Sequence, residues 1–153
     1  MSYQWVLAFA LHQLGVIVWI GGMFFAHVVL RPAAADLLPT PQRLELMLRV
    51  FNRFFVLVWG AILFLWTSGL WIFLSLYGGK AGHHVHAMMG LAFIMTVLFL
   101  FIWIGPYRRM KAAVAAKDWI AAGERLSRIR GIILLNLLLG LITAVLGVTR
   151  TGL

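Results

Sequence analysis

The sequence predicts an all-α integral membrane protein: a single domain built as a bundle of four spanning helices, with both termini outside. Hydrophobic residues make up 63% of the 153-residue chain and charged residues only 11%, whereas soluble domains are nearer half apolar and a quarter charged. The apolar residues fall in four runs of about the 20 residues that a spanning helix needs. These runs cover residues 5–30, 54–77, 86–107 and 131–149, and none of them contains Asp or Glu.

The first run carries two histidines, His12 and His27, and leads into a connection over residues 31–53. Within this connection Thr40 is expected to cap a helix whose first position is Pro41. Apolar residues then recur at spacings of three and four, which predicts an amphipathic helix running into the second span. They are Leu44, Met47, Leu48 and Phe51.

The second connection, residues 78–85, is short and rich in glycine, and the third, residues 108–130, is strongly basic. Asp118 is expected to cap a helix that continues into the fourth span. On that span a stripe of small and polar residues predicts close helix packing in lipid, within the bundle or in a homo-oligomer. The stripe consists of Asn136, Gly140, Thr143 and Gly147.

Charge predicts the orientation. Of the 13 Lys and Arg residues, only Lys80 and Arg150 lie outside the first and third connections. The positive-inside rule places those two connections in the cytoplasm and both termini outside, and we expect a multi-pass protein of the bacterial inner membrane. This topology accounts for the net charge of +9, so no nucleic-acid partner is expected. The absence of cysteine excludes disulfides, thiolate metal sites and iron–sulfur clusters.

Histidines inside a membrane are costly, usually face the bundle interior and point to function. His12 lies about 10 Å inside the outer boundary at 1.5 Å per residue, and the group His83, His84 and His86 begins the third span at that same boundary. His27 lies near the opposite end, where no other histidine is expected. Only a pairing of His12 with the 83–86 group is therefore predicted.

Helical phase favours His86 as the partner. His12, Gly15 and Trp19 share one stripe of the first span, and a similar stripe lies on the third span. That second stripe consists of His86, Gly90 and Phe93. Each stripe offers an imidazole, a glycine that leaves room for a flat ligand, and an aromatic wall. This arrangement predicts haem b between the two helices with His12 and His86 as axial ligands, and a redox role.

Two alternatives stay open. Copper is the first, bound by His83, His86 and Met89, because soft thioethers favour Cu(I). The second is a non-catalytic membrane subunit whose histidines are interfacial. The lack of carboxylates in the spans argues against a proton pump or an acid–base hydrolase, whereas a haem supplies its own electron chemistry.

The run Leu11-His12, Trp19, Gly21-Gly22 and Phe24 resembles the first helix of the CopD-like and HemJ-like four-helix membrane proteins. HemJ-type members are protoporphyrinogen IX oxidases that bind haem b, and CopD-type members are associated with copper resistance or uptake. The resemblance implies haem binding by His12 and His86. For such a haem protein the electron partner is expected to be quinone, oxygen or a porphyrinogen, and the sequence does not choose among them. In HemJ-type proteins a lysine follows the third-helix histidine by two positions. Met88 stands there, so the chain looks closer to the CopD-like branch and the oxidase activity is not expected to carry over.

Overall fold

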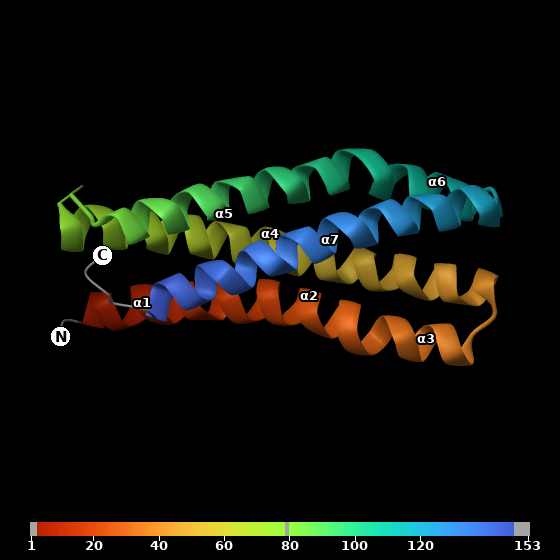
Figure 1. Ribbon diagram of the computed structural model, residues 1–153, viewed down its shortest axis with the longest axis horizontal. Coiled ribbons are helices and arrows are strands. Elements are labelled where there is room, and N and C mark those ends of the chain that lie inside the picture. Colours follow the sequence, from red (N-terminus) through yellow and green to blue (C-terminus); the bar gives the residue numbers. More distant parts are fainter. Residues whose placement is uncertain (1–2, 79, 149–153) are drawn as a thin grey trace.

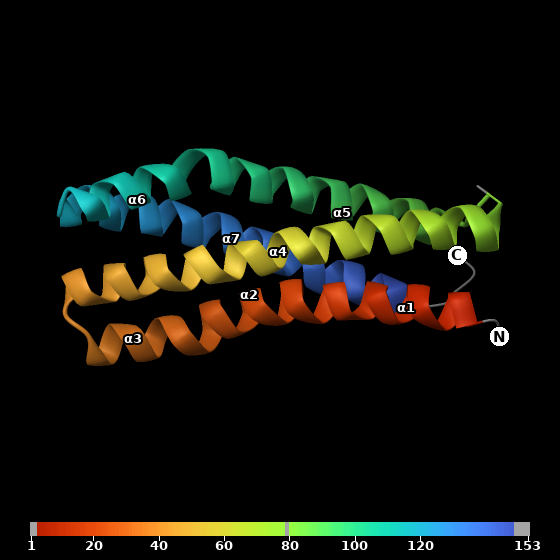
Figure 2. The ribbon, with the colours of Figure 1, turned by 180° about the vertical axis from the view of Figure 1, so that it is seen from behind.

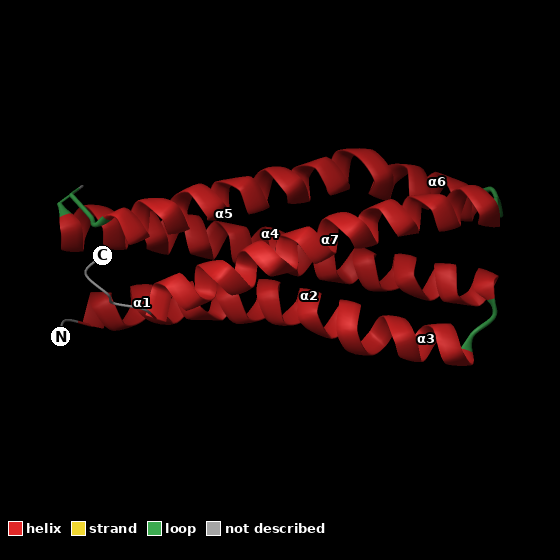
Figure 3. Ribbon diagram, in the orientation of Figure 1, coloured by secondary structure: helices red, strands yellow, loops and turns green. Residues whose placement is uncertain are grey.

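The computed structural model describes residues 3–78 and 80–148 as four long helical rods, shown in Figures 1 and 3. The first rod runs through five segments: α1 (Tyr3–Val16), η1 (Ile17–Gly21), α2 (Gly22–Phe24), η2 (Phe25–Leu30) and α3 (Arg31–Leu37). The second rod is α4 (Thr40–Tyr77), the third comprises α5 (His83–Ile102), η3 (Trp103–Tyr107) and α6 (Arg108–Ala115), and the fourth is α7 (Trp119–Val148). All four are long and apolar enough to cross a membrane, so the predicted all-α four-helix membrane fold is confirmed.

The rods are longer than the predicted spans. α4 has 38 residues, so at 1.5 Å per residue it is about 57 Å long, nearly twice the roughly 30 Å hydrocarbon core of a bilayer. The first and third connections are therefore mostly helix: only Leu38 and Pro39 separate α3 from α4. The amphipathic helix expected before the second span is confirmed as the first turns of α4. Residue 149 and Arg150 lie outside the described residues.

The two predicted helix caps have different outcomes. The cap expected at Thr40 is wrong by one residue, because Pro39 is the N-cap, Thr40 is already helical, and no side chain caps this end. Proline is tolerated in the first turn, where the missing N–H would have had no helical partner anyway. At the start of α7, the Ala121 N–H donates to the carboxylate of Asp118 at 3.0 Å, which confirms the other cap.

Two prolines lie within the rods without ending them. Pro106 lies inside the wide turn η3, and Pro32 is the second residue after the wide turn η2. A proline ring clashes with the carbonyl four residues earlier and removes one helical hydrogen bond. A π-type turn relaxes the four-residue spacing that causes this clash. The helical run that begins with the first span therefore extends to Leu37, beyond the predicted end of the span at Leu30.

Both ends of the described chain lie at one end of the bundle, together with the α4–α5 connection (Figures 1 and 2). The α3–α4 and α6–α7 turns lie at the other end, so the rods run alternately up and down. α1 packs mainly on α4, and α5 packs mainly on α7. The chain is thus a multi-pass membrane protein whose basic connections gather at one end and whose exposed apolar side chains meet lipid.

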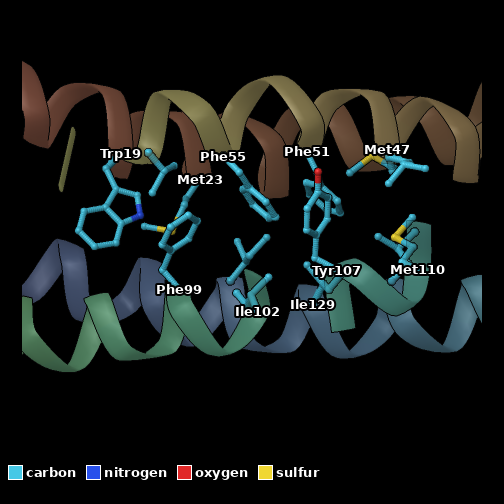
Figure 4. Packing of buried hydrophobic residues seen from close by; sticks show 14 of the residues in the cluster. Trp19, Met23, Met47, Phe51, Phe55, Phe99, Ile102, Tyr107, Met110 and Ile129 are labelled. Carbon is cyan, nitrogen blue, oxygen red and sulfur yellow. The ribbon is translucent and has the colours of Figure 1, made fainter. Parts of the chain in front are cut away.

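The core fills the layer between the first two rods and the last two, as Figure 4 shows. Phe55 is at its centre: its ring stacks on Phe51 at 5.2 Å and meets Phe99 and Tyr107 edge-on at 5.5 Å and 4.9 Å between centroids. Fewer side chains of α5 are buried toward the end that holds the termini, since the first buried residue of this helix is Met95. The rigid part of the bundle is therefore its middle and its basic half.

The stripe predicted on the fourth span packs within this bundle. Asn136 is buried and donates to the Met95 carbonyl at 3.2 Å. A Cβ at Gly140 would lie 3.0 Å from Ile20 of the first rod, and a Cβ at Gly147 would lie 3.2 Å from the methyl of Met88. A homo-oligomer stays a prediction.

Candidate functional site

His12 is held against α4 by two glycines, one on each helix. A Cβ at Gly15 would lie 2.8 Å from Cγ of Leu65 and 3.1 Å from the Ala61 carbonyl oxygen, so α1 approaches α4 closely at this turn. One turn nearer the end that holds the termini, Gly69 of α4 faces the imidazole, where a Cβ would lie 3.2 Å from Cε1. Because neither glycine has a side chain, the His12 ring can lie directly on the α4 backbone.

A hydrogen-bond chain orients this imidazole. Nδ1 of His12 lies 3.1 Å from Oγ of Ser68, a side chain that is 5% exposed. The Ser68 hydroxyl in turn donates to the Phe64 carbonyl oxygen one turn back along α4. A hydroxyl has a single hydrogen, so once it is given to Phe64 the serine oxygen accepts from His12. We therefore assign the proton to Nδ1, which leaves Nε2 with a free lone pair.

This arrangement is the one that prepares a histidine to bind a metal. A ligating imidazole commonly donates its other ring N–H to an oxygen acceptor, which sets the tautomer, orients the ring and raises its basicity. Ser68 was recognisable from the sequence as a hydroxyl of the second span that could reach a ligand in the outer half of the membrane. Its hydrogen bond to His12 was not predicted, because helical phase alone does not say which helix His12 faces.

His86 lies elsewhere. Its side chain is exposed, and its ring meets Phe73 of α4 edge-on, with centroids 5.6 Å apart and planes at 75°. His12 contacts Ser68 and Gly69 of α4, and Phe73 lies one helical turn beyond Gly69. The two imidazoles therefore contact different residues of α4.

The four residues predicted to line a ring also lie at separate places. Trp19 is 3% exposed and packs edge-to-face on Phe99 in the core, with centroids 6.4 Å apart. Gly15 is covered by Leu65. On α5, Gly90 has open space where a side chain would be, and Phe93 is 60% exposed. The first stripe faces the bundle and the second, with His86, faces outward; their role toward a cofactor stays a prediction.

The residues of the copper alternative begin α5. His83 is exposed, His84 folds back over Gly82, and Met89 is half-buried. Across residues 3–78 and 80–148, no group of three or more His, Cys, Asp or Glu side chains is placed to hold a metal ion.

No protein-family model, curated protein or solved structure matches this chain. The likeness of the first helix to CopD-like and HemJ-like proteins therefore stays a resemblance. The function has to be argued from the arrangement of the side chains themselves.

His12 could bind haem iron. Its imidazole is neutral, Nδ1–H is hydrogen-bonded to Ser68, and Nε2 is left as the nitrogen that would bind the metal. The arrangement does not fit a ring set between the two stripes as they are packed, because Leu65 covers Gly15 while the side chains of His86 and Phe93 are exposed. The residues present thus support His12 as one fixed ligand. His86 as a second ligand stays a prediction.

His27, for which no histidine partner was expected, lies at a different site at the basic end. It borders a cavity of about 10 Å³ together with Arg31 and Arg130. Sequence reasoning missed this cluster because it sought another histidine. The usable signal was that Arg31 follows His27 by one turn and that Arg130 is the last basic residue before the fourth span.

Proposed function

We propose that this multi-pass protein of the bacterial inner membrane binds haem b through His12 and has a redox role. The observation that carries the proposal is the chain from His12 Nδ1 to Ser68 and on to the Phe64 carbonyl, which leaves Nε2 free for iron. A buried polar chain of this kind needs a reason in a membrane interior, where polar side chains are costly. Orienting a metal ligand supplies that reason.

The residues divide the work between them. Ser68 fixes the tautomer and direction of His12, and the Gly15 and Gly69 contacts hold α1 and α4 at the distance that the hydrogen bond needs. When bound, a haem would supply one-electron chemistry whose potential depends on its axial ligands and their hydrogen bonds. Quinone, oxygen or a porphyrinogen is the proposed reaction partner.

His86 is the proposed second ligand. It lies in the part of α5 before Met95, which has no buried side chain among the described residues. Moving this part toward His12 therefore disturbs little packing. His12 would be the fixed ligand and His86 the adjustable one.

The test is the absorption spectrum of the protein purified from haem-replete cells. We expect a Soret band and a reduced α-band in the wild type, loss of both in His12→Ala, and a shifted spectrum with retained haem in His86→Ala. His84→Ala is the matched control, since His84 folds back over Gly82, and it should leave the spectrum unchanged. A colourless wild-type protein, or an unchanged spectrum in His12→Ala, would overturn the proposal.

The same preparations test the alternatives. Copper binding predicts stoichiometric metal that is lost in His83→Ala and His86→Ala but kept in His12→Ala. A non-catalytic subunit predicts neither haem nor copper. Oxidation of protoporphyrinogen by the pure protein should be weak or absent, because Met88 stands in place of the lysine and its methyl packs toward Gly147. Robust turnover would contradict that expectation.

A further inference from the structure

The cavity at the basic end has an apolar floor and a basic rim. Its floor consists of buried side chains from three rods, and its rim consists of the half-buried His27, Arg31 and Arg130. The floor residues are Ala26, Met47, Phe51 and Ile133. Arg43 lies close enough to Arg130 for their charges to interact. Basic groups from the first, second and fourth rods therefore converge on one point.

No acid balances them there. None of the residues that line the cavity is acidic. The four carboxylates of the chain, Asp36, Glu45, Asp118 and Glu124, are all exposed. Nε of Arg130 is buried and has no hydrogen-bond partner. A charged donor buried without an acceptor is unfavourable, and neighbouring like charges add repulsion, so a bound anion would relieve both costs.

The cavity also limits what the anion is. Its volume of about 10 Å³ is roughly the room that one water-sized atom needs. One oxygen of a phosphate can therefore reach Arg130, while the rest of the group stays at the rim. Guanidinium groups match phosphate geometry well, since their N–H groups form a planar fork of donors.

We propose that this cavity binds the phosphate of an anionic phospholipid from the leaflet at the basic end. The cavity lies where the apolar part of the first rod gives way to Arg31, the level at which lipid phosphates lie. Phe24 and Val28, which flank His27 on the same rod, are about half exposed and offer apolar surface for acyl chains. Basic pockets between spanning helices on the cytoplasmic side are a recurring form of lipid recognition. The inference does not depend on haem.

The test measures lipids retained by the purified full chain in native mass spectrometry, after exchange into detergent with phosphatidylglycerol, phosphatidylcholine or both. We expect phosphatidylglycerol to be retained at least about tenfold more than phosphatidylcholine. Arg130→Gln should lower retention about tenfold, the effect of losing one charge-assisted hydrogen bond. Arg130→Lys should also lower it, because lysine keeps the charge but lacks the fork.

Arg109→Gln is the matched control, since Arg109 is exposed on α6 and does not line the cavity. It removes one charge from the same end and should change retention by less than about twofold. If Arg130→Gln does not fold, Arg31→Gln takes its place with the same expected loss. Equal losses in the cavity variant and in Arg109→Gln would reduce the effect to general surface charge and overturn the proposal. Displacement of the lipid by excess inorganic phosphate would overturn its assignment to a lipid.

Discussion

Replacing Gly15 by alanine tests whether the α1–α4 contact holds His12 in place. The new Cβ would lie 2.8 Å from Leu65 Cγ, about 0.6 Å inside the 3.4 Å of an ordinary contact, and 3.1 Å from a backbone oxygen that cannot turn aside. Relief requires the two helices to separate. Overpacking of this kind costs about 1–3 kcal/mol. A separation of about 0.6 Å along the hydrogen bond would also lengthen its 3.1 Å to about 3.7 Å, beyond hydrogen-bonding range.

Gly21→Ala is the matched control, because a Cβ at Gly21 meets nothing within 4 Å. Both changes replace glycine by alanine in the same rod, so the gain in helix propensity of up to about 1 kcal/mol cancels between them. Thermal or denaturant unfolding in detergent should therefore show Gly15→Ala less stable than Gly21→Ala by about 1–3 kcal/mol. The haem spectrum should shift only in Gly15→Ala. Equal stabilities would refute the close contact between α1 and α4 at Gly15. If Gly15→Ala is destabilised but its haem spectrum is unchanged, this contact does not hold His12 in its haem-binding position.

Three further changes test single interactions. Ser68→Ala should keep haem but shift its reduction potential and α-band, because His12 loses the acceptor that orients it; unchanged values in redox titration would contradict the tautomer assignment. Asp118→Ala should lower the free energy of unfolding by about 1 kcal/mol through loss of the cap, with Glu124→Ala as an exposed control that changes little. Tyr107→Phe should lower the free energy of unfolding by about 1 kcal/mol, since the phenol donates a hydrogen bond to Oδ1 of Asn52 on α4. Equal unfolding curves would show that this hydrogen bond does not stabilise the fold.

The architecture was predictable because it depends on gross features of the chain. Four apolar runs free of carboxylates, with basic residues confined to two connections, leave few arrangements other than an alternating bundle. The cap at Asp118 was also readable, since it depends on neighbours in the chain. The end of the first helical run near Pro32 was not readable, because the wide turn that precedes this proline has no clear sequence signature.

The candidate site was predictable only in part, for a geometric reason. Helical phase and depth say which residues share a stripe and at what level they lie, and they singled out His12, which in the structure faces Ser68 of α4. They do not say how four helices are ordered around the bundle. Both histidines lie against α4, where the first meets Ser68 and the second meets Phe73. The basic cavity was missed for the same reason, since its rim draws on two rods that are not consecutive in the chain.

The distribution of packing connects the fold to the proposed chemistry. The stacked aromatics around Phe55 hold the middle and the basic half of the bundle, whereas α5 has no buried side chain before Met95 among the described residues. In the proposed redox site, His12 would be the rigid ligand, because the Gly15 and Gly69 contacts fix it independently of α5. His86, the proposed second ligand, lies in the part of the bundle with no buried side chain on α5 among the described residues. This asymmetry makes His12, and not the pair, the residue on which the proposed function depends.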